Sequence, residues 1–218
     1  QMCIRDRTRH KRRTDPSAKR LRLSLKAGIL PVDFQPNDKG VWEGTMTQAD
    51  PVFAERHEAA RIAPLLGVAL GDLDEAFPIQ NVSTGRPNLL VMFRSLAALQ
   101  RATLDWPAID AYFAAGDRQR GFYLLCQETR SGSHDFHARK VGRGFEDPVT
   151  GSAAGAAIAW LVHMGKVASG RKIAIEQGTE IARAGTAYAS AEMRNGRVTN
   201  VKVGGASVHI MDGVLYRG

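Results

Sequence analysis

The sequence predicts an α+β fold with many antiparallel strands and few helices. Short runs of apolar and β-branched residues, bounded by turn residues, recur along the chain. Two of these turns, Asn195-Gly196 and Asp212-Gly213, are dipeptides typical of β-hairpins. The segment from Gly151 to Met164 is long, apolar and almost uncharged, which is the composition of a buried helix. We therefore expect a sheet-rich protein with one central helix.

The first half of the chain is predicted to combine strands with short helices. Leu21–Leu25 alternates apolar and polar residues, and the turn residues of Pro36–Gly40 predict a hairpin. Helical spacing from Phe53 to Leu66 predicts a helix that Pro64 interrupts. The other elements expected in this half are strands at 29–34, 41–47, 79–83 and 89–93 and helices at 95–102 and 107–115.

The second half is predicted to be mostly strand around the apolar helix. Gly165 ends this helix at 151–164, and Gly151, Gly155 and Ala159 recur every four residues along it. One helix face is therefore small enough for another backbone to approach closely. The strands expected in this half are 121–127, 135–140, 172–176, 186–193, 198–203 and 207–211.

The composition excludes several classes of protein. The 218 residues are 44% hydrophobic and 24% charged, as in ordinary globular proteins. No apolar run approaches the length of about 18 residues that a membrane span needs. Two cysteines are too few for a disulfide framework, and Cys126 lies in an apolar strand, which favours a core position. We expect a cytoplasmic protein without a membrane span.

The net charge of +8 comes from the N-terminus. Residues 1–26 contain ten Lys or Arg and two Asp, whereas the remaining residues contain twenty charges of each sign. The basic segment contains no aromatic side chain on which a base would stack, so we do not expect nucleic-acid binding. We interpret residues 1–20 as a basic tail outside the fold and leave the atypical opening, 1–7, out of the fold prediction.

The segment from Gly144 to Ala159 contains the strongest candidate site. Asp147 and Ser152 flank a Pro-Val-Thr-Gly turn that opens directly into the apolar helix. The first N–H groups of a helix lack partners within it and lie at the positive end of its dipole. They can hold a substrate carboxylate while a nearby side chain exchanges a proton. The structural alternatives are a helix N-cap for Asp147 and a hydrogen bond to the first-turn amides for Ser152.

Three neighbouring polar residues give weaker signals. Glu146 should point away from Asp147 in an extended segment, so we expect it to be solvated. His134 and His137 bracket Asp135, but alternation along a strand would separate the two rings. No further ligand cluster is evident, so we expect neither a metal site nor a cofactor.

The octapeptide Glu146–Ala153, EDPVTGSA, resembles the signature of the PhzF-like phenazine biosynthesis proteins. The resemblance covers roughly residues 25 to 218. Further segments follow in the order and spacing of that family, namely Met46-Thr-Gln48, Val82-Ser-Thr-Gly85, His137-Ala-Arg139, Glu176-Gln-Gly178 and Val203-Gly-Gly205.

The resemblance implies a diaminopimelate-epimerase-like fold. Such proteins have two similar lobes, each a mostly antiparallel sheet around a central helix, with the site between them. It also implies an isomerase that moves a proton on a small carboxylate-bearing substrate without metal or cofactor. Asp147 is then catalytic, and Asp147, Gly151 and Ser152 bind the substrate. Residues 53–205 would form the second lobe around helix 151–164, and 21–52 with 206–218 a remnant of an incomplete first lobe.

The first lobe of the family is only partly matched. Neither its proton-shuttling glutamate nor its Gly-His motif has a counterpart in this chain. We therefore expect a C-terminal fragment that is inactive or nearly so by itself. A non-catalytic small-molecule-binding lobe is the alternative. The unpaired edges of an incomplete sheet also leave a homodimer open.

Overall fold

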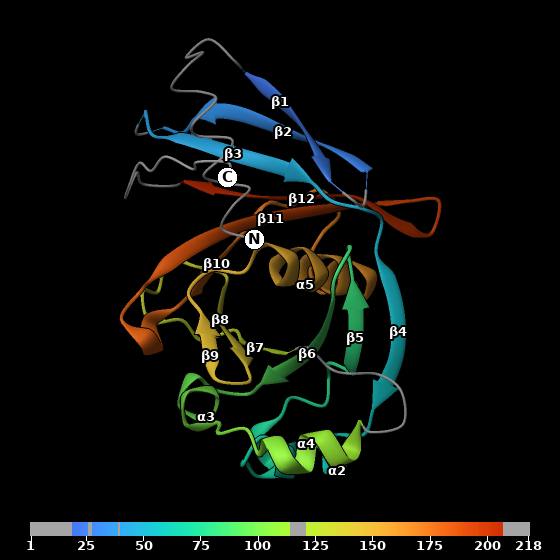
Figure 1. Ribbon diagram of the computed structural model, residues 1–218, viewed down its shortest axis with the longest axis vertical. Helices are drawn as coiled ribbons and strands as arrows, with labels where there is room; N and C mark the ends of the chain where they lie inside the picture. Colours follow the sequence, from blue (N-terminus) through green and yellow to red (C-terminus); the bar gives the residue numbers. More distant parts are fainter. Residues whose placement is uncertain (1–18, 26–27, 39, 114–120, 207–218) are drawn as a thin grey trace, which may run out of the picture.

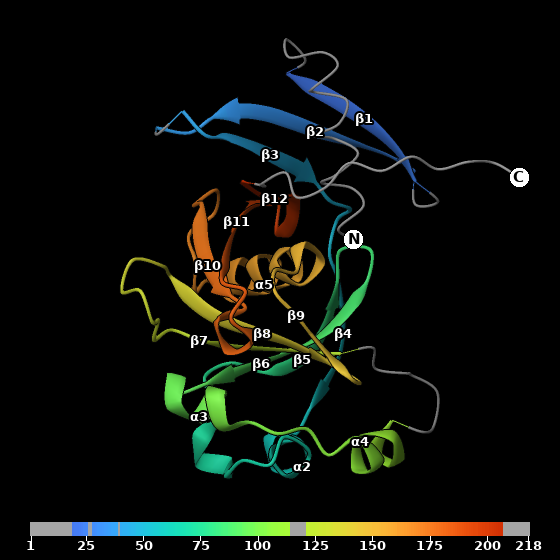
Figure 2. The same cartoon turned by 60° about the vertical axis from the view of Figure 1, so that its left-hand side comes forward.

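The computed structural model describes residues 19–25, 28–38, 40–113 and 121–206. Its strands form one twelve-stranded sheet with the order β1-β2-β3-β12-β11-β10-β8-β7-β6-β5-β4, and β9 pairs with β8. The sheet curls around the helix α5, and three short helices lie on its outer side (Figure 1 and Figure 2). This arrangement confirms the predicted α+β class.

Strands and helices follow one another along the chain in an irregular order. They are β1 (Arg20–Leu25), β2 (Gly28–Pro36), β3 (Trp42–Thr47), β4 (Val52–His57), α2 (Ala59–Leu65), the 3-10 turn η1 (Leu70–Asp72), β5 (Ile79–Ser83), β6 (Pro87–Phe93), α3 (Leu96–Arg101), α4 (Trp106–Tyr112), β7 (Phe122–Cys126), β8 (Phe136–Gly142), β9 (Phe145–Asp147), α5 (Gly151–His163), β10 (Ile173–Gln177), the 3-10 turn η2 (Thr179–Ile181), β11 (Gly185–Arg194) and β12 (Arg197–Ala206).

The helix α5 is the centre of the core. Every residue from Ala153 to Val162 is buried, and Trp160 is fully enclosed. Strands from distant parts of the chain, β5, β6, β11 and β12, pack against this helix (Figure 1). An uncharged helix has no face that is stable in water, so it needs cover on all sides. The predicted central helix is confirmed to within one residue.

The middle strands are buried on both faces. In β7, Tyr123 and Leu125 point toward α5, while Phe122, Leu124 and Cys126 pack against α2, α3 and α4. Because successive side chains of a strand point to opposite faces, a strand between two helical layers must be apolar at every position. This explains the unbroken apolar run of the sequence in β7, and it confirms Cys126 as a core residue.

The hairpin β2–β3 is joined to the rest of the sheet through β12. Met46 of β3 pairs with Val32 on one side and with Val203 on the other. The hairpin turn begins at Asn37, whose side-chain oxygen accepts a hydrogen bond from the amide of Val41 at 2.9 Å. The predicted hairpin is therefore confirmed. The division of the chain into lobes remains a prediction.

The predicted helix from Phe53 to Leu66 is only half correct. Residues 52–57 form the strand β4, which pairs with β5 through Phe53 and Val82, and the helix α2 begins at Ala59. The Phe53 ring also stacks on His163 at the end of α5, with 4.3 Å between ring centroids. Pairing and stacking with distant segments thus override the local helical spacing.

The strand predicted at 207–211 and the turn Asp212-Gly213 lie outside the described residues. Within the described part of the chain, no helix has the length and apolar character that crossing a membrane requires.

Gly155 provides a stability test of the packing on α5. A Cβ atom at Gly155 would overlap Gln48 Oε1, and Gln48 is held in place by two hydrogen bonds. We expect Gly155→Ala to lower the free energy of unfolding by about 1–2 kcal/mol, because overpacking outweighs the gain in helix propensity. Urea denaturation measures this change.

The control is Gly151→Ala in the same helix. The nearest heavy atom to a Cβ at Gly151 is Val203 Cγ1, at an ordinary contact distance of 3.8 Å. We expect a change in stability smaller than about 0.5 kcal/mol at this position. Equal losses in the two variants would contradict the close packing of Gln48 on the helix.

Candidate active site at the start of α5

Asp147 ends β9 and lies one turn before α5. Its Oδ2 accepts a hydrogen bond of 2.7 Å from the hydroxyl of Thr150, and its side chain is partly exposed. The N-cap residue of α5 is Thr150, so the alternative that Asp147 caps the helix is wrong. Asp147 therefore presents a carboxylate beside the helix N-terminus while only one hydroxyl engages it among the described residues.

Buried Gln177 of β10 fixes the conformation of this turn. Its Nε2 donates to the backbone oxygen of Asp147 and, at 3.1 Å, to Thr150 Oγ1, while its Oε1 accepts from the Thr150 amide at 3.2 Å. The neighbouring Gly178 has φ +87°, and a Cβ there would lie 2.6 Å from the backbone oxygen of Pro148. The turn and the strand end are thus locked together, and the direction of the Asp147 carboxylate is set by β10.

A second buried amide, Gln48, joins two other segments to the first turn of α5. Gln48 Nε2 donates to the backbone oxygen of Gly151 at 3.0 Å, and its Oε1 accepts from the Thr84 hydroxyl at 2.5 Å. There is free space next to the Cα atom of Gly151, and the Ser152 side chain is partly exposed. The structure thus brings together all three predicted site residues, Asp147, Gly151 and Ser152, around the start of one helix.

Lys140 is an additional charged group near Asp147. Its Cα is the register partner of Asp147 between β8 and β9, and its amine donates to Asn88 Oδ1 at 2.6 Å and to the Gly121 carbonyl at 3.1 Å. Burial, followed by repulsion from Arg86, lowers the pKa of Lys140 to about 7, while the Asp147 carboxylate opposes this change. No sequence pattern pointed to this residue, because a lysine in a strand ordinarily faces solvent.

Glu146 is not solvated, in contrast to its prediction. It forms a two-pronged ion pair with Arg139, with Nε–Oε1 and Nη2–Oε2 distances of 3.0 and 2.9 Å, and both side chains are largely covered. Arg139 also donates to the backbone oxygen of Leu99 at 3.1 Å. Glu146 does point away from Asp147, as alternation along the strand requires, but that direction leads to the α3 region and not to water.

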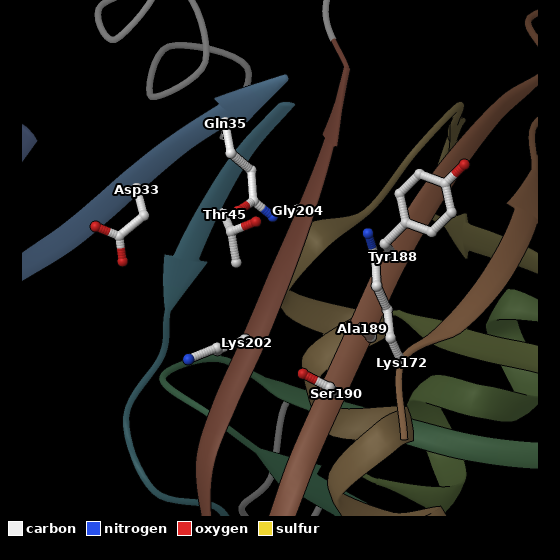
Figure 3. A pocket seen from close by; sticks show the side chains of 9 residues that line it. All are labelled: Asp33, Gln35, Thr45, Lys172, Tyr188, Ala189, Ser190, Lys202 and Gly204. Atoms are coloured by element: carbon white, nitrogen blue, oxygen red, sulfur yellow. The ribbon is translucent and has the colours of Figure 1, made fainter. Parts of the chain in front are cut away.

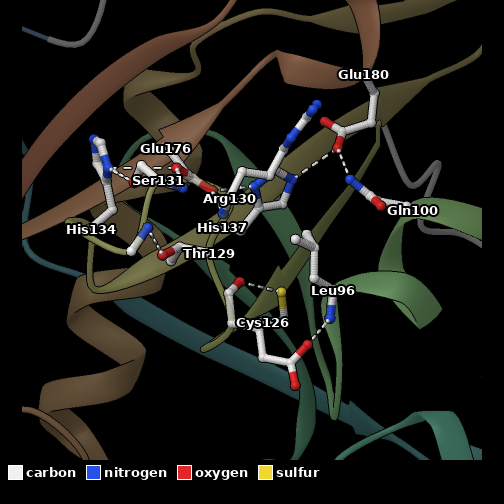
Figure 4. A network of polar contacts seen from close by, with 12 residues as sticks. Leu96, Gln100, Cys126, Thr129, Arg130, Ser131, His134, His137, Glu176 and Glu180 are labelled. Carbon is white, nitrogen blue, oxygen red and sulfur yellow. Dashed lines mark hydrogen bonds and ion pairs between the residues drawn. The ribbon is translucent and has the colours of Figure 1, made fainter.

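A buried histidine of β8 lies between two carboxylates, those of Glu176 on β10 and Glu180 on η2 (Figure 4). His137 is fully buried, with Nδ1 2.8 Å from Glu176 Oε1 and Nε2 3.1 Å from Glu180 Oε1. Ionised carboxylates only accept hydrogen bonds, so both ring nitrogens must donate and the ring is an imidazolium. Burial alone would lower the pKa of His137, but the two carboxylates raise it overall. Burial raises the pKa values of Glu176 and Glu180, but the hydrogen bonds from His137 outweigh this effect. The pKa of Glu176 is therefore lowered, and that of Glu180 falls to about 2.

The neighbouring His134 contacts two hydroxyls and, at a longer distance, one carboxylate of this cluster. Ser131 Oγ and Glu176 Oε2 both approach the ring nitrogen Nδ1, at 2.6 and 3.5 Å, while Nε2 lies 2.8 Å from Thr186 Oγ1. Among the described residues, no group of three or more His, Cys, Asp and Glu side chains is arranged to hold a metal ion.

A separate pocket of about 240 Å³ lies on the face of β11 and β12 that points away from α5 (Figure 3). Tyr188 and Ser190 of β11 line it, and they alternate with Ala187 and Ala189, which belong to the core around α5. Its cations are Lys172 and Lys202. None of the predicted site residues lines this pocket, so the candidate site and the pocket are distinct.

The signature around Asp147 agrees with a comparison against protein families. A family model described as phenazine biosynthesis-like protein matches residues 8–213. The chain belongs to this family. It is 31% identical over 205 residues to a trans-2,3-dihydro-3-hydroxyanthranilate isomerase of Pseudomonas aeruginosa, and the match covers 90% of this chain and 67% of the relative. The chain thus spans about two thirds of the length of that relative.

Solved structures confirm the epimerase-like fold. A PhzF-family phenazine biosynthesis protein of Bacillus anthracis superposes with a TM-score of 0.77 at 24% identity, covering 90% of this chain and 69% of the other. A probable proline racemase of Agrobacterium radiobacter superposes with a TM-score of 0.56 at 10% identity, covering 88% and 61%. At such low identities these likenesses establish the fold alone, as the resemblance had predicted.

The buried cluster of His137 predicts a pH optimum of stability. A raised pKa for His137 contributes stability that is fully present below about pH 6.5 and is lost as pH rises through the higher folded-state value. The lowered pKa values of Glu176 and Glu180 contribute stability that is present above about pH 4.5 and is lost on acidification. This cluster should therefore stabilise the fold most between these two limits, as measured by urea denaturation across the pH range.

The matched variants are His137→Gln and His163→Gln. Loss of the imidazolium leaves two buried carboxylates without a cation, so we expect His137→Gln to cost about 3 kcal/mol at pH 6 and to flatten the decline above pH 6.5. His163 is exposed at the end of α5 and stacks on Phe53, so its variant should lose no more than about 1 kcal/mol. An unchanged pH profile in His137→Gln would contradict the assigned imidazolium.

Proposed function

We propose that this chain contributes the second-lobe half of the site of a cofactor-independent isomerase. The enzyme would move a proton on a small carboxylate-bearing substrate, with Asp147 exchanging or orienting that proton. The first-turn amides of α5 and the Ser152 hydroxyl would bind the substrate carboxylate. The observation that carries this proposal is the position of the Asp147 carboxylate, held by Thr150 at 2.7 Å directly beside the start of a buried helix.

The electrostatics of the helix start support this assignment. The dipole of α5 favours an anion at Gly151, where the first-turn amides lack partners within the helix. The first turn contains no acidic side chain, so nothing within the helix competes with a bound carboxylate. Gln177 and Gln48 hold the turn and the helix start in place, which keeps the two functions, anion binding and proton exchange, at a fixed separation.

The substrate class follows from the chemistry that such a site recognises. The Pseudomonas aeruginosa relative is named for trans-2,3-dihydro-3-hydroxyanthranilate, a ring that carries a carboxylate with an amino and a hydroxyl group. We propose a substrate of this class for the present chain, with the carboxylate at α5 and a donor group at Asp147. A homodimer and a cytoplasmic location remain predictions.

Binding of anthranilate, the aromatic analogue of that substrate, tests the assigned carboxylate site. We expect the largest NMR shift changes at the amides of Gly151, Ser152 and Ala153, and Ser152→Ala should weaken binding about tenfold, since it removes a hydrogen bond to an anion. Ser133→Ala, at an exposed serine, is the control and should leave affinity unchanged. Shifts confined to the Tyr188 pocket would contradict the proposal.

Deuterium exchange into the substrate tests whether the main acid–base group lies outside these 218 residues. No residue among the 218 corresponds to the first-lobe glutamate of the family. We therefore expect the chain to bind trans-2,3-dihydro-3-hydroxyanthranilate but to exchange its protons slowly or not at all in D2O. Any residual exchange should fall at least about 100-fold in Asp147→Asn, because a general acid–base group contributes that much. Mass spectrometry measures the exchange. Robust turnover by the unmodified 218 residues would contradict the assignment of the main acid–base group to another segment.

A further inference from the structure

The amine of Lys140 is buried, and the groups that it contacts among the described residues are neutral. The residue is 8% exposed, and its amine donates to the amide oxygen of Asn88 and to the Gly121 carbonyl. Among the described residues it forms no ion pair. The described contacts of this ammonium are thus two neutral oxygens, whereas a buried cation ordinarily pairs with an anion.

The local structure is shaped to hold the amine at this place. Gly121 has φ +152°, and a Cβ there would lie 3.0 Å from the Lys140 Nζ and 3.2 Å from its Cε. Asn88 donates through Nδ2 to the Arg86 carbonyl at 2.9 Å, which turns its Oδ1 toward Lys140. A side chain at position 121 would crowd the amine and would need a strained backbone, so a glycine suits this contact with Lys140.

Three neighbouring strands bring Lys140 into one row with Asp147. Tyr123 of β7 pairs with Lys140 of β8, and Lys140 pairs with Asp147 of β9. Paired residues of adjacent strands project to the same side, with Cβ atoms about 5 Å apart. The Tyr123 hydroxyl is fully buried and has no hydrogen-bond partner among the described residues. The row therefore places three polar side chains, those of Tyr123, Lys140 and Asp147, beside the start of α5.

We propose that Lys140 is the charge partner of Asp147 and a specificity-determining residue of this site. Its ammonium balances the Asp147 carboxylate, so an anionic substrate meets a site without net negative charge. Lys140 acts on the substrate through Asp147 and is in this sense a positioning residue. The substrate part of the inference rests on the proposed function, whereas the pairing of the two charges rests on the strand register alone.

The charge balance should change near neutral pH. Among the described residues, the charged groups that act on Lys140 are Arg86 before β6 and Asp147 on β9, and the titratable Tyr123 of β7 is its register partner. Burial and Arg86 lower the pKa of Lys140 to about 7. Above that pH the amine is neutral and the Asp147 charge is unbalanced. Affinity for a carboxylate ligand should therefore fall as the pH rises through 7.

The first test follows the Lys140 amine directly, through the NMR signal of its labelled Cε carbon. We expect a midpoint near pH 7 in the wild-type chain and a midpoint lower by about half a pH unit in Asp147→Asn, because the opposite charge is gone. This variant retains a side-chain oxygen to accept the Thr150 hydroxyl. Asp110→Asn, at an exposed carboxylate, should leave the midpoint unchanged. Equal midpoints in wild type and Asp147→Asn would overturn the charge pairing.

The second test measures anthranilate affinity between pH 6 and pH 8.5, a range in which this ligand stays anionic. We expect the affinity of the wild-type chain to fall about fivefold to tenfold, equivalent to one charge contact. Lys140→Met should bind anthranilate weakly at pH 6 and at pH 8.5, without a fall in affinity between them. Lys166→Met, at an exposed lysine, should behave as wild type. Parallel profiles in wild type and Lys140→Met would overturn the specificity role. Absence of binding at every pH would overturn the proposed function together with that role, and the Lys140 titration would still decide the charge pairing.

Discussion

Burial of the helix α5 is the constraint on which the rest of this structure depends. From Gly151 to Val162 the helix contains no charged side chain, and ten consecutive residues are buried. Such a helix is stable only when apolar strands cover it on every side, so the sheet has to curl around it. Gly155 allows Gln48 to lie directly on the helix. The first turn of α5 stays partly accessible, and the signature places Ser152 in this turn and Asp147 just before it.

The polar groups near this turn show how a buried helix start is held in position. Gln177 and Gln48 direct their hydrogen bonds to backbone atoms of the turn and of the helix. Each of these bonds contributes only about 1 kcal/mol to stability, but a lost partner would leave a buried amide unsatisfied, with a larger loss of stability. The network therefore fixes geometry more than it adds stability. A precise start of α5 is what a carboxylate-binding site and a nearby proton-exchanging group both require.

Local patterns in the sequence were sufficient to predict part of this structure. The composition of the 151–164 segment predicted the buried helix, and the turn residues near Asn37 predicted the β2–β3 hairpin. The EDPVTGSA signature supplied the three candidate site residues, which the structure places around the start of one helix. The failures share a cause, since β4, Glu146 and Lys140 depend on partners far away in the chain. No local sequence signal predicts three long-range contacts. These are the pairing of Phe53 with Val82, the ion pair of Glu146 with Arg139, and the hydrogen bonds of the Lys140 amine to Asn88 and Gly121.

The most direct test of the proposed site is a crystal structure of this chain with bound anthranilate. We predict that the carboxylate of the ligand lies within hydrogen-bond distance of the first-turn amides of α5 and of Ser152, with the amino group beside Asp147. Anthranilate bound elsewhere, for example in the pocket lined by Tyr188 and Lys202, with the start of α5 occupied only by water, would contradict this assignment.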